Sequence, residues 1–101
     1  MKTFQEYLNE IKTEPNLIEE VKKLRTKERQ KNKNDDYTLG TIEGLSVAID
    51  CIKDNKNLTG KPLILELRKI RDSAESTYKN KENSDFISGV RNGIGMATDL
   101  I

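Results

Sequence analysis

Apolar residues recur along most of the chain at intervals of three and four, which is the spacing of one face of an α-helix. The first such stretch ends near Lys12, and its apolar members are Phe4, Tyr7, Leu8 and Ile11. The second begins at Pro15, a residue suited to the first turn of a helix, and its stripe is formed by Leu17, Ile18, Val21 and Leu24. No apolar residue follows until Tyr37, so we expect a frayed helix end and a loop in the later part of that interval, and the sequence does not fix whether the helix continues through residue 34.

A third helix is predicted to run to about Asp54. Either Asp35 or Asp36 can begin it, because a carboxylate accepts hydrogen bonds from the free amides of a first helical turn. Its main apolar face is formed by Ile42, Leu45, Ile49 and Ile52. A turn-rich segment follows, in which Gly60 is expected to break the helix.

Two more helices complete the chain. One starts at Pro62, and its inner side is marked by Leu63, Leu67, Ile70 and Ala74. The run LILEL, residues 63–67, could instead form a strand, but no second strand is available to pair with it, so we prefer a helix. The last helix is capped by Ser84 or Asp85 and continues to the C-terminus.

The third and fifth helices share a sequence pattern. When residues 36–52 (DYTLGTIEGLSVAIDCI) are aligned with residues 85–101 (DFISGVRNGIGMATDLI), six of the 17 positions are identical. About one identity would be expected by chance, so the pattern indicates an internal repeat. The identical pairs are Asp36/Asp85, Gly40/Gly89, Gly44/Gly93, Ala48/Ala97, Asp50/Asp99 and Ile52/Ile101.

We therefore predict an all-α, single-domain protein of about five helices, packed as a small bundle with pseudo-twofold symmetry. A short N-terminal helix (1–14) precedes two repeated helical hairpins, residues 15–54 and 62–101. A chain of 101 residues is long enough to bury a core without a disulfide or a structural metal.

Small residues four apart form a side-chain-poor face on each repeated helix. These helix-packing positions are Gly40, Gly44 and Ala48 in the first copy and Gly89, Gly93 and Ala97 in the second. With Gly95, the five interior glycines cost about 4–5 kcal/mol in helix propensity, against a total stability of about 5–15 kcal/mol for a domain. We expect close helix packing to offset this cost, within a monomer or between the subunits of a homodimer. A groove for a foreign ligand or partner is the alternative.

The charge of the chain is concentrated in one segment. The net charge is only +1, but residues 21–34 carry seven basic residues and one acidic residue, Glu28, a local net charge of +6. The candidate partner-binding residues are Lys22, Lys23, Arg25, Lys27 and Arg29. They could form a solvated helix face, or contact an acidic protein surface or nucleic acid. No aromatic residue lies among them to stack on bases, which disfavours the last of these.

Catalytic, cofactor-binding and metal-binding residues are not recognisable. The chain has no histidine, so its serines lack the usual base partner, and we predict that it is not an enzyme. Asp50 and Asp99 could face each other to share a proton or bind a divalent cation, but a solvated face is the preferred interpretation. Cys51 is the single cysteine, which excludes an intrachain disulfide and fits a small buried thiol.

No stretch approaches the about 18 apolar residues of a membrane span, and the N-terminus lacks the apolar core of a secretion signal. We therefore expect a cytoplasmic protein that does not enter a membrane.

Residues 37–52 (YTLGTIEGLSVAIDCI) resemble helices in small accessory proteins of phages and prophages of low-GC bacteria, a group that includes anti-CRISPR proteins. The length and the abundance of Lys and Asn agree with that group. The resemblance implies a non-enzymatic inhibitor that binds a host protein or ribonucleoprotein complex, such as a CRISPR–Cas nuclease, and blocks it by covering a surface. A nucleic-acid-binding accessory protein or small regulator is an alternative. Sequestration of a small signalling ligand between the repeated helices is another.

Overall fold

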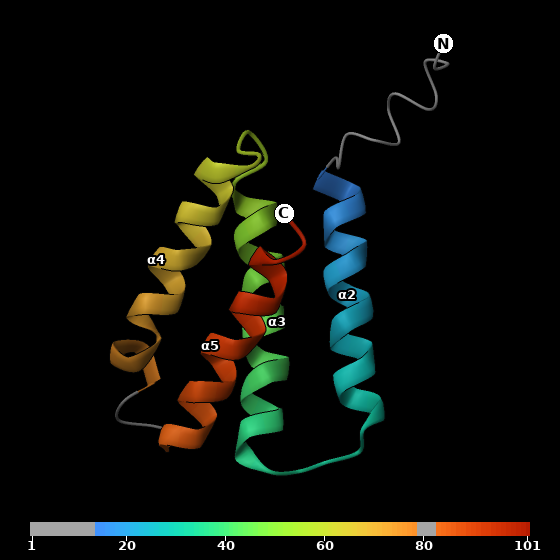
Figure 1. Ribbon diagram of the computed structural model, residues 1–101, viewed down its shortest axis with the longest axis vertical. Helices are drawn as coiled ribbons and strands as arrows, with labels where there is room; N and C mark the ends of the chain where they lie inside the picture. Colours follow the sequence, from blue (N-terminus) through green and yellow to red (C-terminus); the bar gives the residue numbers. More distant parts are fainter. Residues whose placement is uncertain (1–13, 79–82) are drawn as a thin grey trace.

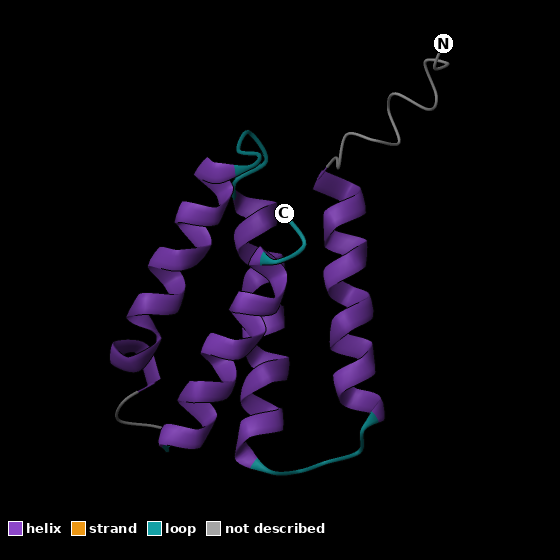
Figure 2. Ribbon diagram, viewed as in Figure 1, coloured by secondary structure: helices purple, strands orange, loops and turns teal. Residues whose placement is uncertain are grey.

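The computed structural model describes residues 14–78 and 83–101, and these residues form four helices joined by turns and loops (Figures 1 and 2). The helices are α2 (Glu14–Gln30), α3 (Asp36–Asp54), α4 (Lys61–Tyr78) and α5 (Ser84–Thr98). No strand occurs in these two ranges, and the run 63–67 is helical within α4. The prediction of an all-α bundle is confirmed, with four helices where about five were expected. Residues 1–13 of the predicted N-terminal helix (1–14) lie outside the described residues, and Glu14 is the first residue of α2.

The four helices are arranged as two hairpins that meet along their second helices. In Figure 1, α3 and α5 lie side by side at the centre and run in the same direction. Helix α2 packs on α3, and α4 packs on α5, each in the opposite direction to its partner. As a result, α2 and α4 lie at opposite edges of the molecule, and each has one face on the bundle.

All four helices contribute to the core, which follows the helical spacing of apolar residues. Its buried members are Leu17 and Val21 of α2, Leu45, Ala48, Ile49, Cys51 and Ile52 of α3, Leu63, Leu67 and Ala74 of α4, and Val90, Ile94 and Ala97 of α5. Burying a leucine or isoleucine side chain contributes about 1.5–3 kcal/mol. The predicted core is largely found, but Ile42 is only half-buried, and Thr41 lies deeper on α3 than Ile42 does.

The starts of α3 and α5 are fixed by side-chain caps. Asp35 accepts hydrogen bonds from the backbone N of Thr38 at 3.1 Å and from its hydroxyl at 2.9 Å. At α5 the cap is Asn83, which accepts from the backbone N of Phe86 at 2.9 Å. The prediction of Ser84 or Asp85 as this cap is wrong, because the amide that needs a partner lies three residues after Asn83. Asn83 also donates to the carboxylate of Asp36, which joins the two helix starts.

Helix α2 extends further than its apolar stripe predicts. The apolar stripe ends at Leu24, but the helix continues to Gln30, and the frayed end and loop expected in the later part of this interval correspond to the turn and loop over residues 31–35. Its last turns are held by polar contacts: Glu28 is only 9% exposed and accepts a hydrogen bond from Lys31 at 2.9 Å. The helix then ends near Asn32, whose φ of 53° is left-handed. Gly60 was expected to break the third helix, but α3 has already ended at Asp54 with Asn55 as its cap. Gly60 instead directly precedes α4, with a φ of 59°, a conformation that favours glycine.

Candidate functional site

The five predicted partner-binding residues lie on α2, at one edge of the bundle, and the structure divides them between two flanks of this helix. Lys23 and Lys27 are one turn apart and share one flank. Lys22, Arg25 and Arg29 follow one another at intervals of three and four and share the other flank. The sequence therefore groups residues that do not form a single patch.

Arg25 is turned towards α3. Its Nη1 donates a hydrogen bond to the hydroxyl of Ser46 at 3.2 Å, and Ser46 donates in turn to the backbone oxygen of Ile42 at 3.1 Å. The Nε of Arg25 is buried and has no hydrogen-bond partner among the described residues. Arg25 therefore belongs to the contact between α2 and α3, and we no longer count it among the outward-facing cations.

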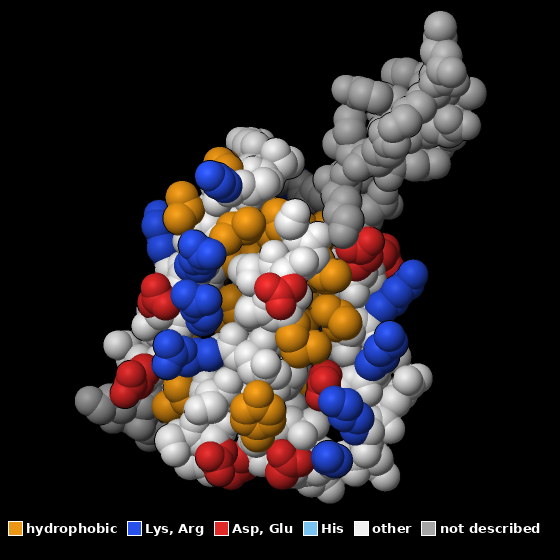
Figure 3. Space-filling model, viewed as in Figure 1, with side chains coloured by type: hydrophobic (Ala, Val, Ile, Leu, Met, Phe, Trp, Pro, Cys, Tyr) orange, Lys and Arg blue, Asp and Glu red, His pale blue; other side chains and the backbone are white. Residues whose placement is uncertain are grey.

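The remaining cations differ in how their charge is compensated. Lys22 is half-buried and forms an ion pair with Glu19 at 3.5 Å. Lys23, Lys27 and Arg29 are exposed, and none of them makes an ion pair with a described residue. Lys23 and Lys27 border the outward side of α2 on one flank and Arg29 borders it on the other, and we call these three residues together the cationic edge of α2. Figure 3 shows Lys and Arg side chains following α2 on the face in view.

The cationic edge can attract an anionic surface. Exposed ammonium and guanidinium groups attract carboxylates and phosphates at long range and speed their encounter with the protein. Each exposed pair adds only about 0.2–1 kcal/mol, so a specific partner must use several such contacts together.

The predicted helix-packing residues lie between α3 and α5. A Cβ added to Gly40 would lie 2.1 Å from the carbonyl oxygen of Phe86, and one added to Gly44 would lie 2.1 Å from that of Val90. A real Cβ could not lie this close to a carbonyl oxygen. The backbones of α3 and α5 therefore pack directly against each other, with no side chain between them at these positions. Ala48 continues this face and is fully buried.

The glycines of α5 are packed against the backbone of α3 in the same way. A Cβ on Gly89 would lie 2.2 Å from the carbonyl oxygen of Tyr37, and one on Gly93 would lie 2.3 Å from that of Thr41. Ala97 is also fully buried. The contact is therefore internal to one chain. The sequence left two other uses open for the small-residue faces of α3 and α5, an interface between two subunits and a groove for a ligand. The structure supports neither, because the two faces cover each other.

Gly95 differs from the other interior glycines of α5. Apart from its chain neighbours and the backbone of its own helix turn, a Cβ added to it would meet no atom of the described residues within 4 Å. Helix packing therefore does not require glycine at this position, and the explanation offered for all five interior glycines holds for four of them.

The candidate acid–base and metal residues are not assembled into a site. Asp50 and Asp99 are both exposed to solvent. Among the described residues, no group of three acidic, histidine or cysteine side chains could hold a metal ion. Cys51 is buried, and its burial is the main reason why the pKa of its thiol is raised above the ordinary 9.0, with a smaller contribution from the charge of Glu66.

One exposed surface was missed by the sequence analysis. Leu65 is an exposed apolar residue on α4, although it stands between two core leucines in the sequence. The signal was present: Leu65 is two residues from both Leu63 and Leu67, which places it on the opposite side of the helix.

No protein-family model, curated protein or solved structure matches this chain. Separately, none of the described helices is sufficiently long and apolar to cross a lipid bilayer.

Proposed function

We propose that this protein is a non-enzymatic inhibitor that binds an acidic surface of a partner through the cationic edge of α2. The observation that supports the proposal is the exposure of Lys23, Lys27 and Arg29, which form no ion pair with a described residue, on a helix held to the bundle by one face. The partner would be a host nuclease or a defence complex such as CRISPR–Cas, encountered in the cytoplasm of a bacterial host. Metal-dependent nucleases have acidic centres, because carboxylates bind their cations, and such a centre is a suitable target.

We further propose that the bundle arose by duplication of a helical hairpin, with pseudo-twofold symmetry between the copies. The contacts of the four packed glycines support this idea, because they are reciprocal at the offset of 49 residues. The approach of Gly40 to Phe86 is matched by that of Gly89 to Tyr37. In the same way, the approach of Gly44 to Val90 is matched by that of Gly93 to Thr41. A rigid central pair of helices would hold α2 at the edge, where it is available to a partner.

The test compares two variants with equal changes of charge. In the first, Lys23, Lys27 and Arg29 are each replaced by Gln; in the second, the three exposed cations Lys53, Lys56 and Arg91, none of them on α2, are replaced in the same way. Each tagged protein is used to capture partners from lysates of a bacterial host with and without a CRISPR–Cas system. The captured proteins are then identified by mass spectrometry.

We expect the wild type and the second variant to retain the same defence protein and the first variant to lose it. Inhibition of that protein's nuclease activity should follow the same order. Equal capture and inhibition by both variants would rule out the cationic edge as the binding surface.

Treatment of the lysate with nuclease separates this proposal from the nucleic-acid alternative. A direct protein contact survives the treatment, whereas a contact through DNA or RNA is lost. Binding of purified DNA or RNA that weakens steeply with salt would favour the alternative, because counterions are released when cations contact phosphates.

A further inference from the structure

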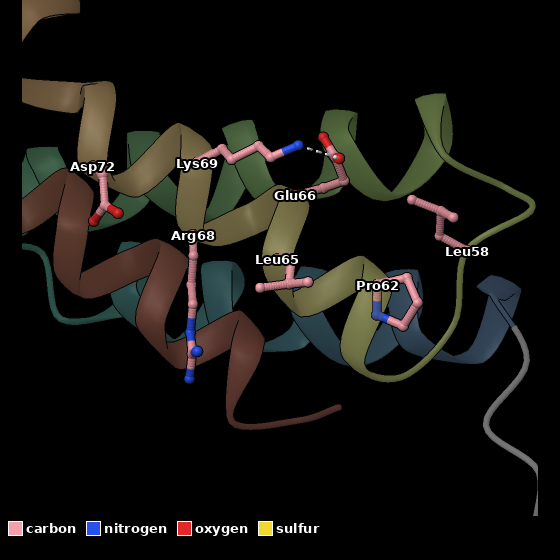
Figure 4. A pocket seen from close by; sticks show the side chains of 7 residues that line it. All are labelled: Leu58, Pro62, Leu65, Glu66, Arg68, Lys69 and Asp72. Atoms are coloured by element: carbon pink, nitrogen blue, oxygen red, sulfur yellow. Dashed lines mark hydrogen bonds and ion pairs between the residues drawn. The ribbon is translucent and has the colours of Figure 1, made fainter.

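The outward face of α4 carries an apolar side chain that the bundle does not cover. Leu65 is 55% exposed, more than any other large apolar side chain among the described residues. It lies with Leu58 and Pro62 in a hollow of about 420 Å³ (Figure 4). The charged residues around this hollow are Glu66, Arg68, Lys69 and Asp72.

This surface is formed almost entirely by one helix. All of the lining residues except Leu58 belong to α4. A neighbouring hollow of about 210 Å³ is lined by Lys61, Ile64, Leu65 and Arg68, again from α4 alone. Sites for small molecules enclose most of their ligand from several sides. An open surface on a single helix suits instead the face of another helix, which can pack along it.

The charges around Leu65 are not balanced. Lys69 forms an ion pair with Glu66 at 3.0 Å. In contrast, Lys61 and Arg68 are exposed, and neither forms an ion pair or side-chain hydrogen bond with a described residue. Figure 4 shows Leu65 between the Lys69–Glu66 pair and Arg68, which points away from that pair. A partner of this surface should therefore supply negative charge on the side of Lys61 and Arg68.

The spacing of Lys61 and Arg68 indicates how far apart the acidic groups of a partner should lie. Lys61 and Arg68 are seven residues apart, so they lie about 10.5 Å apart along the helix axis. Leu65 lies between them on the same outward face. Two helices that cross at a small angle present matching side chains at this heptad interval.

We propose that this α4 face docks an amphipathic helix of a partner protein, in which two acidic residues two turns apart flank an apolar residue. The acidic residues pair with Lys61 and Arg68, and the apolar residue packs on Leu65 and Pro62. Because α2 and α4 lie at opposite edges of the bundle, this surface is separate from the cationic edge of α2 and does not rest on the function proposed above.

The test uses the full chain and two synthetic helical peptides of about 20 residues each. The first peptide has a leucine face flanked by two Glu residues seven positions apart; in the second, both Glu residues are Lys. The chain is labelled with ¹⁵N, and each peptide is titrated while backbone amide shifts are followed by NMR. We expect the acidic peptide to shift the amides of residues 58–72, with about fivefold higher affinity than the basic peptide.

Two variants assign the binding to the proposed contacts. Leu65→Ser removes the apolar contact and should weaken binding of the acidic peptide about fivefold. Lys61→Glu with Arg68→Glu should reverse the preference, so that the basic peptide binds more tightly. Both variants should melt within a few degrees of the wild type, because the replaced side chains are exposed.

Three results would overturn the proposal. They are equal affinity for the two peptides, shifts confined to α2, and binding that is unaffected by Leu65→Ser. If Leu65→Ser left peptide binding unaffected and the protein also bound a DNA duplex or vesicles containing an anionic lipid, the surface would recognise charge alone.

Discussion

The Cα of Gly89 lies 3.0 Å from the point that a Cβ on Gly40 would occupy, and a Cβ on Gly89 would lie 2.9 Å from the Cα of Gly40. Each glycine is therefore required by the other. Both helices give up helix propensity, about 0.8–1 kcal/mol for each glycine relative to alanine. The direct packing of backbone on backbone offsets this cost, and it brings together two hairpins that are distant in the sequence.

Gly44→Ala should destabilise the protein strongly. The new methyl group would lie 2.1 Å from the carbonyl oxygen of Val90, which is backbone and cannot move aside without separating α3 from α5. Overpacking of this kind costs about 1–3 kcal/mol or more. The free energy of unfolding, measured by urea denaturation followed by circular dichroism, should fall by at least that amount.

Gly95→Ala is the matched control, because it makes the same chemical change in a helix interior where the new methyl group meets nothing within 4 Å. It should stabilise the protein by about 0.5–1 kcal/mol through helix propensity alone. Loss of stability in Gly95→Ala, or equal effects of the two substitutions, would show that the glycines are not distinguished by packing.

Cys51 should be protected from thiol reagents in the folded protein. Its side chain is only 4% exposed, and burial raises the pKa of its thiol, so the reactive thiolate is scarce at pH 8. The rate of labelling by a disulfide reagent should be at least about a hundredfold lower than in urea, because reaction requires the structure to open.

The destabilised Gly44→Ala variant provides the control for this measurement. Opening becomes more frequent as stability falls, so its Cys51 should be labelled faster than that of the wild type, and that of Gly95→Ala more slowly. Rapid labelling of the wild-type protein at pH 8 would contradict the burial of Cys51 between the helices.

The packing of α3 on α5 could be anticipated from the sequence because it depends on residue size and spacing. Gly40 and Gly44 cost propensity, lie on one helix face and recur as Gly89 and Gly93, so a close contact was the economical explanation. Whether that contact lay within one chain or between two chains could not be deduced, since the same face serves either arrangement. The structure places it within one chain.

The details that the sequence did not provide depend on polar contacts between distant residues. Arg25 was grouped with its basic neighbours because proximity in sequence carries no information about Ser46, which lies on another helix. The end of α2 could not be fixed for a related reason, since Glu28 lies beyond the apolar stripe and is buried despite its charge. The cap of α5 was misplaced by one or two residues, because Asn83, Ser84 and Asp85 are all suitable cap residues.

Arg25→Met tests the assignment of Arg25 to the α2–α3 contact. Methionine retains much of the apolar stem, loses the hydrogen bond to Ser46 and removes an Nε that is buried without a partner. These effects oppose each other, so the free energy of unfolding should change by no more than about 1 kcal/mol. Capture of the partner should be unchanged, in contrast to the variant that lacks the cationic edge. If a folded Arg25→Met protein no longer captured the partner, Arg25 would have to be counted among the partner-binding residues.

The cap at the start of α3 should make stability depend on pH in the acid range. The hydroxyl of Thr38, and then its backbone N–H, hold the pKa of Asp35 below its ordinary value of 3.8, since both donate to the carboxylate. A lowered pKa in the folded state means that the unfolded chain binds the proton more readily. The stabilisation is therefore complete above the unfolded pKa and is lost as the pH falls through the lower, folded pKa.

Asp35→Ala should accordingly be less stable than the wild type at pH 7, and the difference between them should shrink as the pH is lowered below 3.8. Urea denaturation at a series of pH values measures this difference directly. Asp50→Ala is the control, because Asp50 is an exposed carboxylate on the same helix that makes no hydrogen bond or ion pair through its side chain with a described residue. Its substitution should leave the pH dependence unchanged. A difference between Asp35→Ala and the wild type that persists undiminished below the folded pKa would mean that the ionised carboxylate is not the group that caps α3.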